Sequence, residues 1–456
     1  MRATLPTLVG MSSDIFNHYD GSGVRGVLGQ ENAFIFSVSA RFLLAKVGGV
    51  RLLQRQMIRR DYLIVGAGVG GAGACEGIRE HDKKGTIMLV GNEATLPYHR
   101  PLLLKSYLGK TAEPVSKLLL HDAEWFAKQK IDVRLDTLVT QINLERHLAV
   151  LGNGQAVEFR KACIATGSRA RRTQLAGWNL GNVFYLRTLR DVQALREVVE
   201  IEHQIVVVGG GLIAAETAAL LSQFPKAHVM LMHRGANIWG RTLDPETAAW
   251  LTAYFGKHHV KLLMGETLNG FEGRTVLKNV QTKSGQRFPA SVAVVAFGAE
   301  MNNGLFLNTP LHYPNGTPVN DSLETEEKGI FAVGDIALYP DRVFGGVRRM
   351  EHHNAALAQG RIAGANMSGK KRLKWDWLPH HDSEVFDLHF DFVGDFTKTP
   401  TRYELEGDRA KKKFVVRHYQ HAALTSVVLC NQPPEKVESA KQQVRDCPRE
   451  IKKYGA

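Results

Sequence analysis

Short unbroken runs of apolar residues mark the chain, and two of them break into the same kind of turn. Leu63–Val65 leads into the glycines of LIVGAGVGG, and Val206–Val208 leads into those of VVVGGGLIA. An alanine-rich stretch typical of a helix follows each turn. Because strands buried on both faces of a parallel sheet read as continuous apolar runs, this pattern predicts two strand–turn–helix units.

Further apolar runs extend both units. Thr86–Val90, Lys161–Ser168 and Gly329–Ala337 each contain a run followed by small or acidic residues, and His228–Gly235 does the same after the second unit. Parallel strands end at one edge of a sheet, so these residues are expected to line a crevice there. The pattern predicts an α/β fold with two Rossmann-like dinucleotide-binding domains.

The last part of the chain changes to alternating positions. Glu384–Phe396 alternates like one strand, two more strands are expected at Phe414–Gln420 and Ala423–Asn431, and a helix is expected from Pro434 to Arg445. Arg409–Phe414 follows Gly407-Asp408 and is expected to be a hairpin turn with solvated charge. These elements predict a small C-terminal α+β domain.

Composition narrows the class of protein. The chain has 456 residues, enough for two or three domains, and no apolar stretch long enough to span a membrane. Its four cysteines are scattered, which argues against a disulfide framework, a zinc site or a thiol redox centre and favours a reducing compartment. The formal net charge of +13 indicates either an acidic partner or a solvated basic surface. Nucleic-acid binding is not expected, because the basic runs lack interleaved aromatic residues.

Residues 1–56 stand apart from this pattern. They are poor in acids and combine a glycine-rich stretch with apolar, basic sequence. Two interpretations stay open, a mitochondrial-type presequence or an over-extended start with Met57 as the true first residue, and we favour the second. A poorly structured extension and a cytoplasmic protein are therefore expected, with a mitochondrial location as the alternative.

The first glycine turn carries a dinucleotide-binding pattern. Gly66-x-Gly68-x-x-Gly71, with Gly70 inside it, lets the backbone approach a pyrophosphate at the N-terminus of the following helix. Glu93, after the next strand, is placed to bind ribose hydroxyls, with an exposed loop carboxylate as the alternative. Asp335, just past a buried strand, can accept hydrogen bonds from a ribityl chain.

The second glycine turn repeats the device as Gly209-x-Gly211-x-x-Ala214. The strand after it ends in His233-Arg234. In proteins that bind NADH, an acidic side chain at this position usually binds the ribose 2′-hydroxyl. An arginine there accommodates a 2′-phosphate, so the sequence favours NADPH over NADH. An arginine that simply faces solvent is the other interpretation.

Two longer motifs identify a family. LPYHRPLLLK (Leu96–Lys105) and RMEHHNAALAQGRIAGANM (Arg349–Met367) resemble motifs of the FAD-dependent pyridine nucleotide-disulfide oxidoreductase superfamily, in its ferredoxin/rubredoxin reductase and apoptosis-inducing factor branch. The resemblance covers Met57–Met367 well and the C-terminal part loosely. It implies that the first glycine turn holds FAD and the second holds NADPH or NADH.

The resemblance also implies a set of site residues. Lys105 and Glu216 match a catalytic pair beside the flavin, although a salt bridge that only fixes the domains stays the alternative. His353 is expected on the surface, and no metal site is expected. The FAD-binding set is Gly66, Gly68, Gly70, Gly71, Glu93, Arg100, Lys105, Val139, Thr166, Gly167, Asp335, Glu351 and His352; the NAD(P)-binding set is Gly209, Gly211, Ala214, Glu216, His233, Arg234 and Gly298.

The implied organisation is a discontinuous FAD-binding domain (57–173 and 302–369), an NAD(P)-binding domain (181–301) and a C-terminal interface domain (374–456). The chain departs from the family at Met301, where proline is usual, and at Asp382, where an aromatic is usual. Domains of the C-terminal type often dimerise, so a homodimer stays open.

The implied function is transfer of hydride from NAD(P)H to FAD and of electrons to an external acceptor. The segment Tyr98–Lys110 lacks the redox cysteines of disulfide reductases, so the acceptor is expected to be an acidic electron-transfer protein, a ferredoxin or rubredoxin. One alternative is an NAD(P)H oxidase or a quinone or monodehydroascorbate reductase. Another is a redox-sensing flavoprotein that binds partners or DNA, as in apoptosis-inducing factor.

Overall fold

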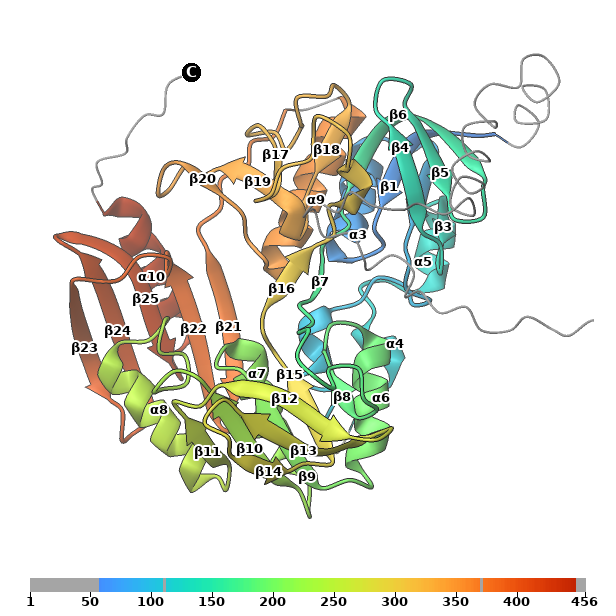
Figure 1. The fold of residues 1–456 in the computed structure, drawn as a ribbon. Coiled ribbons are helices and arrows are strands. Elements are labelled where there is room, and N and C mark those ends of the chain that lie inside the picture. The colour runs from blue at the N-terminus through green and yellow to red at the C-terminus, as the bar shows by residue number, and fades with distance from the viewer. Residues whose placement is uncertain (1–56, 110–111, 370–371, 448–456) are drawn as a thin grey trace, which may run out of the picture. The chain divides into compact units, whose positions relative to one another are not determined.

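The computed structural model describes residues 57–109, 112–369 and 372–447, and the expected extension at residues 1–56 lies outside them. The first sheet contains the parallel strands of the first unit, with β1 between β2 and β6, β3 beyond β2, and β18 beside β6 (Figure 1). Antiparallel β5 and β4 extend it. Its elements are β1 (Ile58–Val65), α3 (Val69–His81), β2 (Ile87–Val90), β3 (Ile131–Arg134), β4 (Val139–Asn143), β5 (Leu148–Leu151), β6 (Ala156–Ile164) and β18 (Ile330–Ala332).

Further elements lie between the strands of the first sheet along the chain or follow them, and they complete this part of the molecule. They are η2 (Arg100–Leu103), α4 (Val115–Leu118), α5 (Ala123–Lys128), η3 (Gly304–Phe306), β17 (Thr317–Pro318), η4 (Gly334–Ile336), β19 (Ala337–Pro340), β20 (Val347–Arg348) and α9 (His353–Ser368). The strands β7 (Ser168–Ala170) and β16 (Ala299–Met301) pair antiparallel where the chain leaves and re-enters this region. The discontinuous FAD-binding domain and the other domain boundaries stay a prediction.

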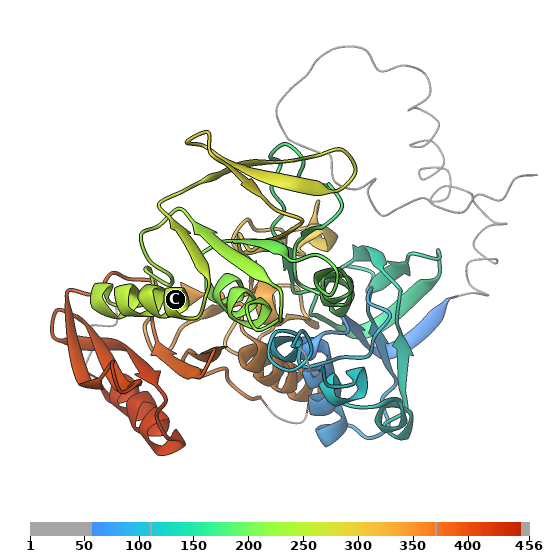
Figure 2. The same cartoon turned by 90° about the horizontal axis from the view of Figure 1, so that it is seen from below.

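Helices α3 and α9 pack unusually closely, although the sequence separates them widely. A Cβ at Gly73 would lie 2.4 Å from the Leu357 carbonyl oxygen, and one at Gly360 would lie 2.2 Å from the Gly70 oxygen. Figures 1 and 2 show the two helices together against the first sheet. The glycines in both motifs therefore allow backbone-to-backbone contact.

The second unit forms a five-stranded parallel sheet in the order β11-β10-β9-β15-β8. A small antiparallel sheet of β12, β13 and β14 accompanies it. The elements are β8 (Val183–Phe184), α6 (Leu189–Val199), β9 (Gln204–Val208), α7 (Leu212–Leu221), β10 (His228–His233), α8 (Pro245–Lys257), β11 (Lys261–Met264), β12 (Leu268–Gly273), β13 (Leu277–Thr282), β14 (Arg287–Pro289) and β15 (Val292–Val295).

The C-terminal region is an antiparallel sheet in the order β21-β22-β25-β24-β23 with one helix. The elements are β21 (His380–Val385), β22 (Leu388–Gly394), β23 (Arg402–Asp408), β24 (Lys413–Gln420), β25 (Ala423–Cys430) and α10 (Pro434–Asp446). The prediction of one strand at Glu384–Phe396 is wrong, because Phe386, at φ +58°, turns the chain between β21 and β22. The alternation of apolar and polar residues continues on both sides of this tight turn, so the alternation alone could not reveal the turn.

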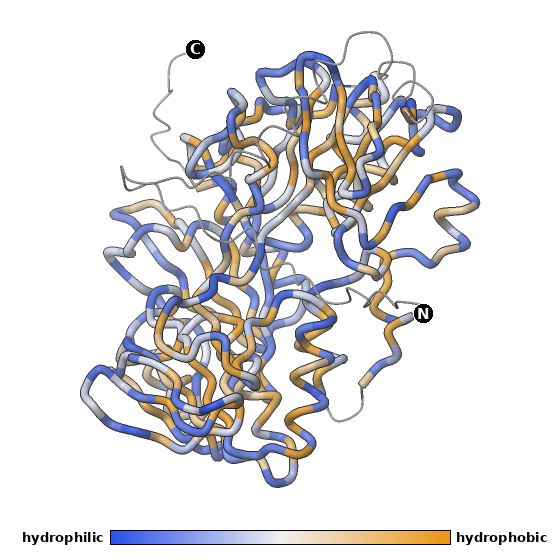
Figure 3. The backbone as a smooth tube through the Cα atoms, turned by 45° about the vertical axis from the view of Figure 1, so that its right-hand side comes forward, coloured by the Kyte–Doolittle hydropathy of each residue, from blue (hydrophilic) through white to orange (hydrophobic). Residues whose placement is uncertain are grey.

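Burial follows the apolar runs. Leu63, Ile64, Val207 and Leu231 lie in the cores of the two parallel sheets, and Figure 3 shows the apolar stretches in orange alternating with hydrophilic stretches in blue. All four cysteines are free, and Cys75 and Cys163 are fully buried. No helix in the described part of the chain has the length and apolarity to cross a bilayer. The predicted α/β class with two Rossmann-like domains and a small C-terminal domain is confirmed.

Candidate functional site

The first glycine turn is open in front of α3. Gly66 has a φ of +114°, and a Cβ there would lie 2.2 Å from the Ala165 carbonyl oxygen, so only glycine fits. Gly71 lies as closely against Gly66, which lets α3 begin directly beside β1. At Gly68, the N-cap of α3, a Cβ would meet no atom within 4 Å. This bare helix N-terminus, next to Gly70 in the first turn, fits a pyrophosphate.

Glu93 and Arg100 are brought together at one end of the first sheet. The Glu93 carboxylate accepts from the Arg100 guanidinium at 2.7 Å and from the Tyr98 hydroxyl at 2.7 Å. Arg100 also donates to the Arg187 carbonyl oxygen at 2.5 Å, and the Leu189 N–H donates to the Tyr98 hydroxyl. Burial raises the pKa of Tyr98, so its hydroxyl stays protonated and able to donate. Glu93 is therefore a fixed carboxylate rather than a free loop side chain.

Asp335 is a buried carboxylate held by two donors that the sequence did not reveal. The Ser168 hydroxyl donates to it at 2.6 Å and the Arg187 guanidinium at 2.7 Å. Ser168 directly follows Thr166 and Gly167, and this position in the motif is the only sequence feature that could have pointed to it as a site residue. Arg187 lies in a connecting segment without a motif. The Thr166 hydroxyl donates to the Asn302 carbonyl oxygen at 2.7 Å, and Gly167, at φ +64°, borders open space.

The remaining predicted FAD contacts lie at different depths. Val139 is buried at the start of β4, in the hydrophobic core to which the first sheet contributes. Glu351 is exposed and pairs with Arg349 at 2.6 Å. It precedes α9, which has His352 as its N-cap.

The two histidines at the start of α9 are partly buried rather than exposed on the surface. Burial lowers the pKa of His352 to about 4, and its Nδ1 is buried without a hydrogen-bond partner among the described residues. An unpartnered polar atom here fits contact with a bound group. The prediction that His353 lies on the surface is wrong: it is partly buried, and its Nε2 lies 3.1 Å from His99 Nδ1, because α9 begins against the segment that precedes η2.

The second glycine turn has the same geometry as the first. A Cβ at Gly209 would lie 2.6 Å from the Ala296 carbonyl oxygen, and Ala214 is fully buried where α7 meets the sheet. Gly211, the N-cap of α7, and Gly298, just after β15, both border open space. The carboxyl ends of two neighbouring strands thus leave room for a second dinucleotide.

The end of β10 brings His233 onto this turn. A Cβ at Gly210 would lie 2.3 Å from the His233 ring, so the imidazole packs directly on the glycine backbone. Burial lowers the pKa of His233, and the charges of Arg234 and Arg241 lower it further. Both arginines are exposed, which gives this end of the turn a positive charge suited to a phosphate.

Lys105 and Glu216 are both held by β21, on its two faces. The Lys105 ammonium pairs with Asp382 and, at 3.1 Å, with Glu384. Glu216 is buried on α7 and accepts from the Ser383 hydroxyl at 2.5 Å. Within the described residues, the direct partners of Lys105 are these two carboxylates rather than Glu216. Sequence reasoning had singled out Asp382 as a departure but missed Ser383 and Glu384.

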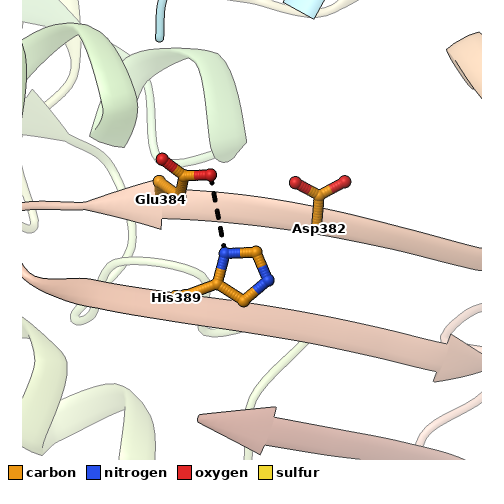
Figure 4. A group of neighbouring side chains, drawn as sticks. All are labelled: Asp382, Glu384 and His389. Carbon is orange, nitrogen blue, oxygen red and sulfur yellow. Dashed lines mark ion pairs between the residues drawn. The ribbon is translucent and has the colours of Figure 1, made fainter. Parts of the chain in front are cut away.

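The carboxylates that hold Lys105 belong to a larger group of charges. Figure 4 shows Asp382, Glu384 and His389, whose potential ligand atoms lie within 4.8 Å of one another. His389 Nδ1 lies 3.5 Å from Glu384, and its Nε2 lies 3.3 Å from Asp391. Because the Lys105 ammonium already contacts two of the three, the group is an ion-pair cluster. The absence of a metal site stays a prediction.

Comparisons with known proteins agree with this geometry. The chain is 32% identical over 372 residues to the ferredoxin reductase component of chlorobenzene dioxygenase from Cupriavidus sp. (strain PS12), covering 81% of this chain and 89% of that one. It is 30% identical over 355 residues to a peroxisomal monodehydroascorbate reductase of Arabidopsis thaliana, covering 74% and 72%. Among solved structures, the covalent putidaredoxin reductase–putidaredoxin complex matches with a TM-score of 0.80 at 29% identity, covering 85% and 93%.

The family model described as pyridine nucleotide-disulphide oxidoreductase matches residues 60–360, which include both glycine turns, Lys105 and Glu216. The match spans well over half of the chain. The protein therefore belongs to the pyridine nucleotide-disulphide oxidoreductase family.

Proposed function

We propose that the protein is an FAD-dependent NAD(P)H oxidoreductase that delivers electrons to a ferredoxin or rubredoxin. The observation that carries the proposal is the pair of open helix N-termini at Gly68 and Gly211, each at the carboxyl end of a parallel strand. Two such sites fit two dinucleotides. Bound FAD supplies the redox chemistry, since it takes up a hydride and gives up electrons singly.

The protein's own residues bind and orient the two dinucleotides in this proposal. The Gly66–Gly71 turn would hold the FAD pyrophosphate, Glu93 and Asp335 would hold its sugar and ribityl hydroxyls, and His352 would contact the ring. Lys105 supplies a positive charge at the reacting end, while Asp382 and Glu384 keep that ammonium in place. Glu216, on α7 behind the second glycine turn, would contribute to binding the nicotinamide. Much of the catalysis is positioning.

An external acceptor is supported by the cysteines. Burial raises the pKa of Cys75 to about 12 and raises that of Cys163 as well, so neither thiol is a reactive thiolate near neutral pH. The named ferredoxin reductase and putidaredoxin reductase relatives use protein acceptors, and the net charge of +13 suits an acidic partner. Buried free thiols also fit the reducing cytoplasm, which we propose as the location.

The proposal includes a preference for NADPH. Arg234 and Arg241 are exposed beside His233, at the position where a 2′-phosphate would lie. The proposed preference for NADPH over NADH depends on the positive charges of these two arginines.

The test is anaerobic titration of the purified protein with NADPH and then NADH, following flavin absorbance near ~450 nm. Prompt bleaching by either nucleotide is expected, with NADPH more effective. A matched variant is Gly211→Asp, which has room for its side chain and places a negative charge at the nucleotide turn. It should retain FAD but lose reduction. Bound flavin that neither nucleotide reduces would contradict the proposal.

A small-molecule acceptor is the second candidate, because the chain is also 30% identical to a monodehydroascorbate reductase. The reduced protein should be mixed separately with oxidised ferredoxin, rubredoxin and monodehydroascorbate. Faster reoxidation by the small radical than by either protein would favour this candidate.

A further inference from the structure

Strand β21 of the C-terminal sheet lies between the two candidate catalytic residues. Successive side chains of a strand point to opposite faces. Asp382 and Glu384 accordingly point to Lys105, while Ser383 points to Glu216 on α7. Three consecutive residues of one strand thus contact both Lys105 and Glu216.

Glu216 has few groups that favour its charged form. The Ser383 hydroxyl, itself fully buried, is its hydrogen-bond partner among the described residues, at 2.5 Å from Oε1. Burial raises the pKa of Glu216 to about 7; the hydrogen bond from Ser383 and the charge of Lys105 act in the opposite direction.

The other charges around Glu216 act in opposite directions, because only Lys105 among them favours the carboxylate. Asp382 and Glu384 repel a second negative charge, and they also partner the Lys105 ammonium directly. The other strands that pack on α7 are β9 and β10, whose buried residues are apolar and whose histidines, His228 and His233, stand at the two ends of β10. The Ser383 hydroxyl is thus the direct polar contact that can hold Glu216 as a carboxylate.

We propose that Ser383 is a positioning residue through which the C-terminal domain keeps Glu216 oriented and stabilises its negatively charged form. The C-terminal domain then completes the site chemically, beyond covering it. The inference concerns a hydrogen bond in the protein itself; its consequence for hydride transfer rests on the proposed function.

The test compares Ser383→Ala with the unmodified protein by infrared titration of the protonated carboxyl band. Glu216→Gln identifies which part of the band belongs to Glu216. Loss of a hydrogen bond to the charged form should move the Glu216 titration upward by about one pH unit. Ser383→Thr, which keeps the hydroxyl, should titrate like the unmodified protein.

Ser426→Ala is the matched control. Ser426 is also a fully buried serine of the C-terminal sheet, but its hydroxyl lies 3.3 Å from His418 Nδ1, away from Glu216. It should leave the Glu216 titration unchanged. An unchanged titration in Ser383→Ala, or an equal shift in Ser426→Ala, would overturn the inference.

A second measurement separates this inference from the proposed function. Stopped-flow rates of flavin reduction by NADPH, measured against pH, should show their inflection moved upward in Ser383→Ala by the same amount as the carboxyl band. If the carboxyl band shifts but no nucleotide reduces the flavin, the role of Ser383 stands and the proposed function fails. If NADPH reduces the flavin normally but the carboxyl band does not move in Ser383→Ala, the proposed function stands and the role of Ser383 fails.

Discussion

Arg409, in the turn between β23 and β24, lies 3.2 Å from the buried carboxylate of Asp244 at the N-terminus of α8. Its guanidinium also donates to Thr247 and pairs with Glu246 at 2.9 Å. The expected solvated charge of this turn is therefore wrong for Arg409, which joins the C-terminal sheet to the second sheet. Arg409→Ala should lower the free energy of unfolding by about 3 kcal/mol, because it leaves a buried carboxylate without its cation.

Urea denaturation measures this loss. Arg402→Ala is the control, since Arg402 pairs with Glu404 on the exposed strand β23. Exposed pairs contribute roughly 0–1 kcal/mol, so this variant should unfold close to the unmodified protein. Equal effects of the two variants would contradict the contact made by Arg409.

The first glycine turn allows fold and cofactor binding to be separated. Gly66→Ala should cost at least about 3 kcal/mol, because its Cβ would collide with the Ala165 carbonyl and its φ is positive. Gly68→Ala meets open space and should change stability by less than about 0.5 kcal/mol, yet its methyl group enters the volume proposed for the pyrophosphate. Thermal unfolding and the flavin-to-protein absorbance ratio check both. A Gly68→Ala protein that retains full FAD would argue against that volume.

The charge cluster on β21 and β22 predicts a pH dependence of stability. Asp391 and Glu384 raise the pKa of His389 from 6.5 to about 10, so its contribution is fully present below pH 6.5 and is lost as pH rises through 10. Hydrogen bonds from His389 and Lys105 lower the pKa of Glu384 from 4.5 to about 2, so that contribution is present above pH 4.5 and is lost as pH falls through 2. Both are complete between pH 4.5 and 6.5.

His389→Gln should therefore lower Tm most between pH 4.5 and 6.5, with the difference from the unmodified protein shrinking toward pH 10. Differential scanning calorimetry across this range measures it. A difference that stays constant with pH would mean that the His389 charge does not contribute.

The coenzyme preference predicts a change of ranking. Replacing Arg234 and Arg241 together by alanine removes the positive charge beside the second turn and should lower kcat/KM for NADPH by about tenfold or more, with little effect on NADH. Each single variant should give part of the loss. A higher kcat/KM for NADH in the unmodified protein would contradict the preference for NADPH.

Local patterns predicted the elements that carry the dinucleotide turns, because strand burial and glycine geometry are determined by neighbouring residues. Gly66 and Gly209 are examples: each needs its positive φ for the turn itself. The partners of Asp335 were not predictable in this way. Arg187 reaches Asp335 across 148 positions of sequence, and Ser383 reaches Glu216 across 167. Such contacts depend on how the sheets meet, which no local pattern encodes.

The crossing of α3 and α9 bears on how the chain is made. The glycine-to-backbone contacts at Gly73 and Gly360 join residues near the start of the described chain to residues that are translated much later, just before the C-terminal sheet. A ribosome therefore releases β1–β6 of the first sheet without β18 and without the helix that covers α3, and the second parallel sheet has to emerge before either. Under the proposed function, we therefore expect FAD to bind late in biosynthesis, and we expect truncated chains that end before Ser368 to bind FAD poorly however well their first glycine turn is formed.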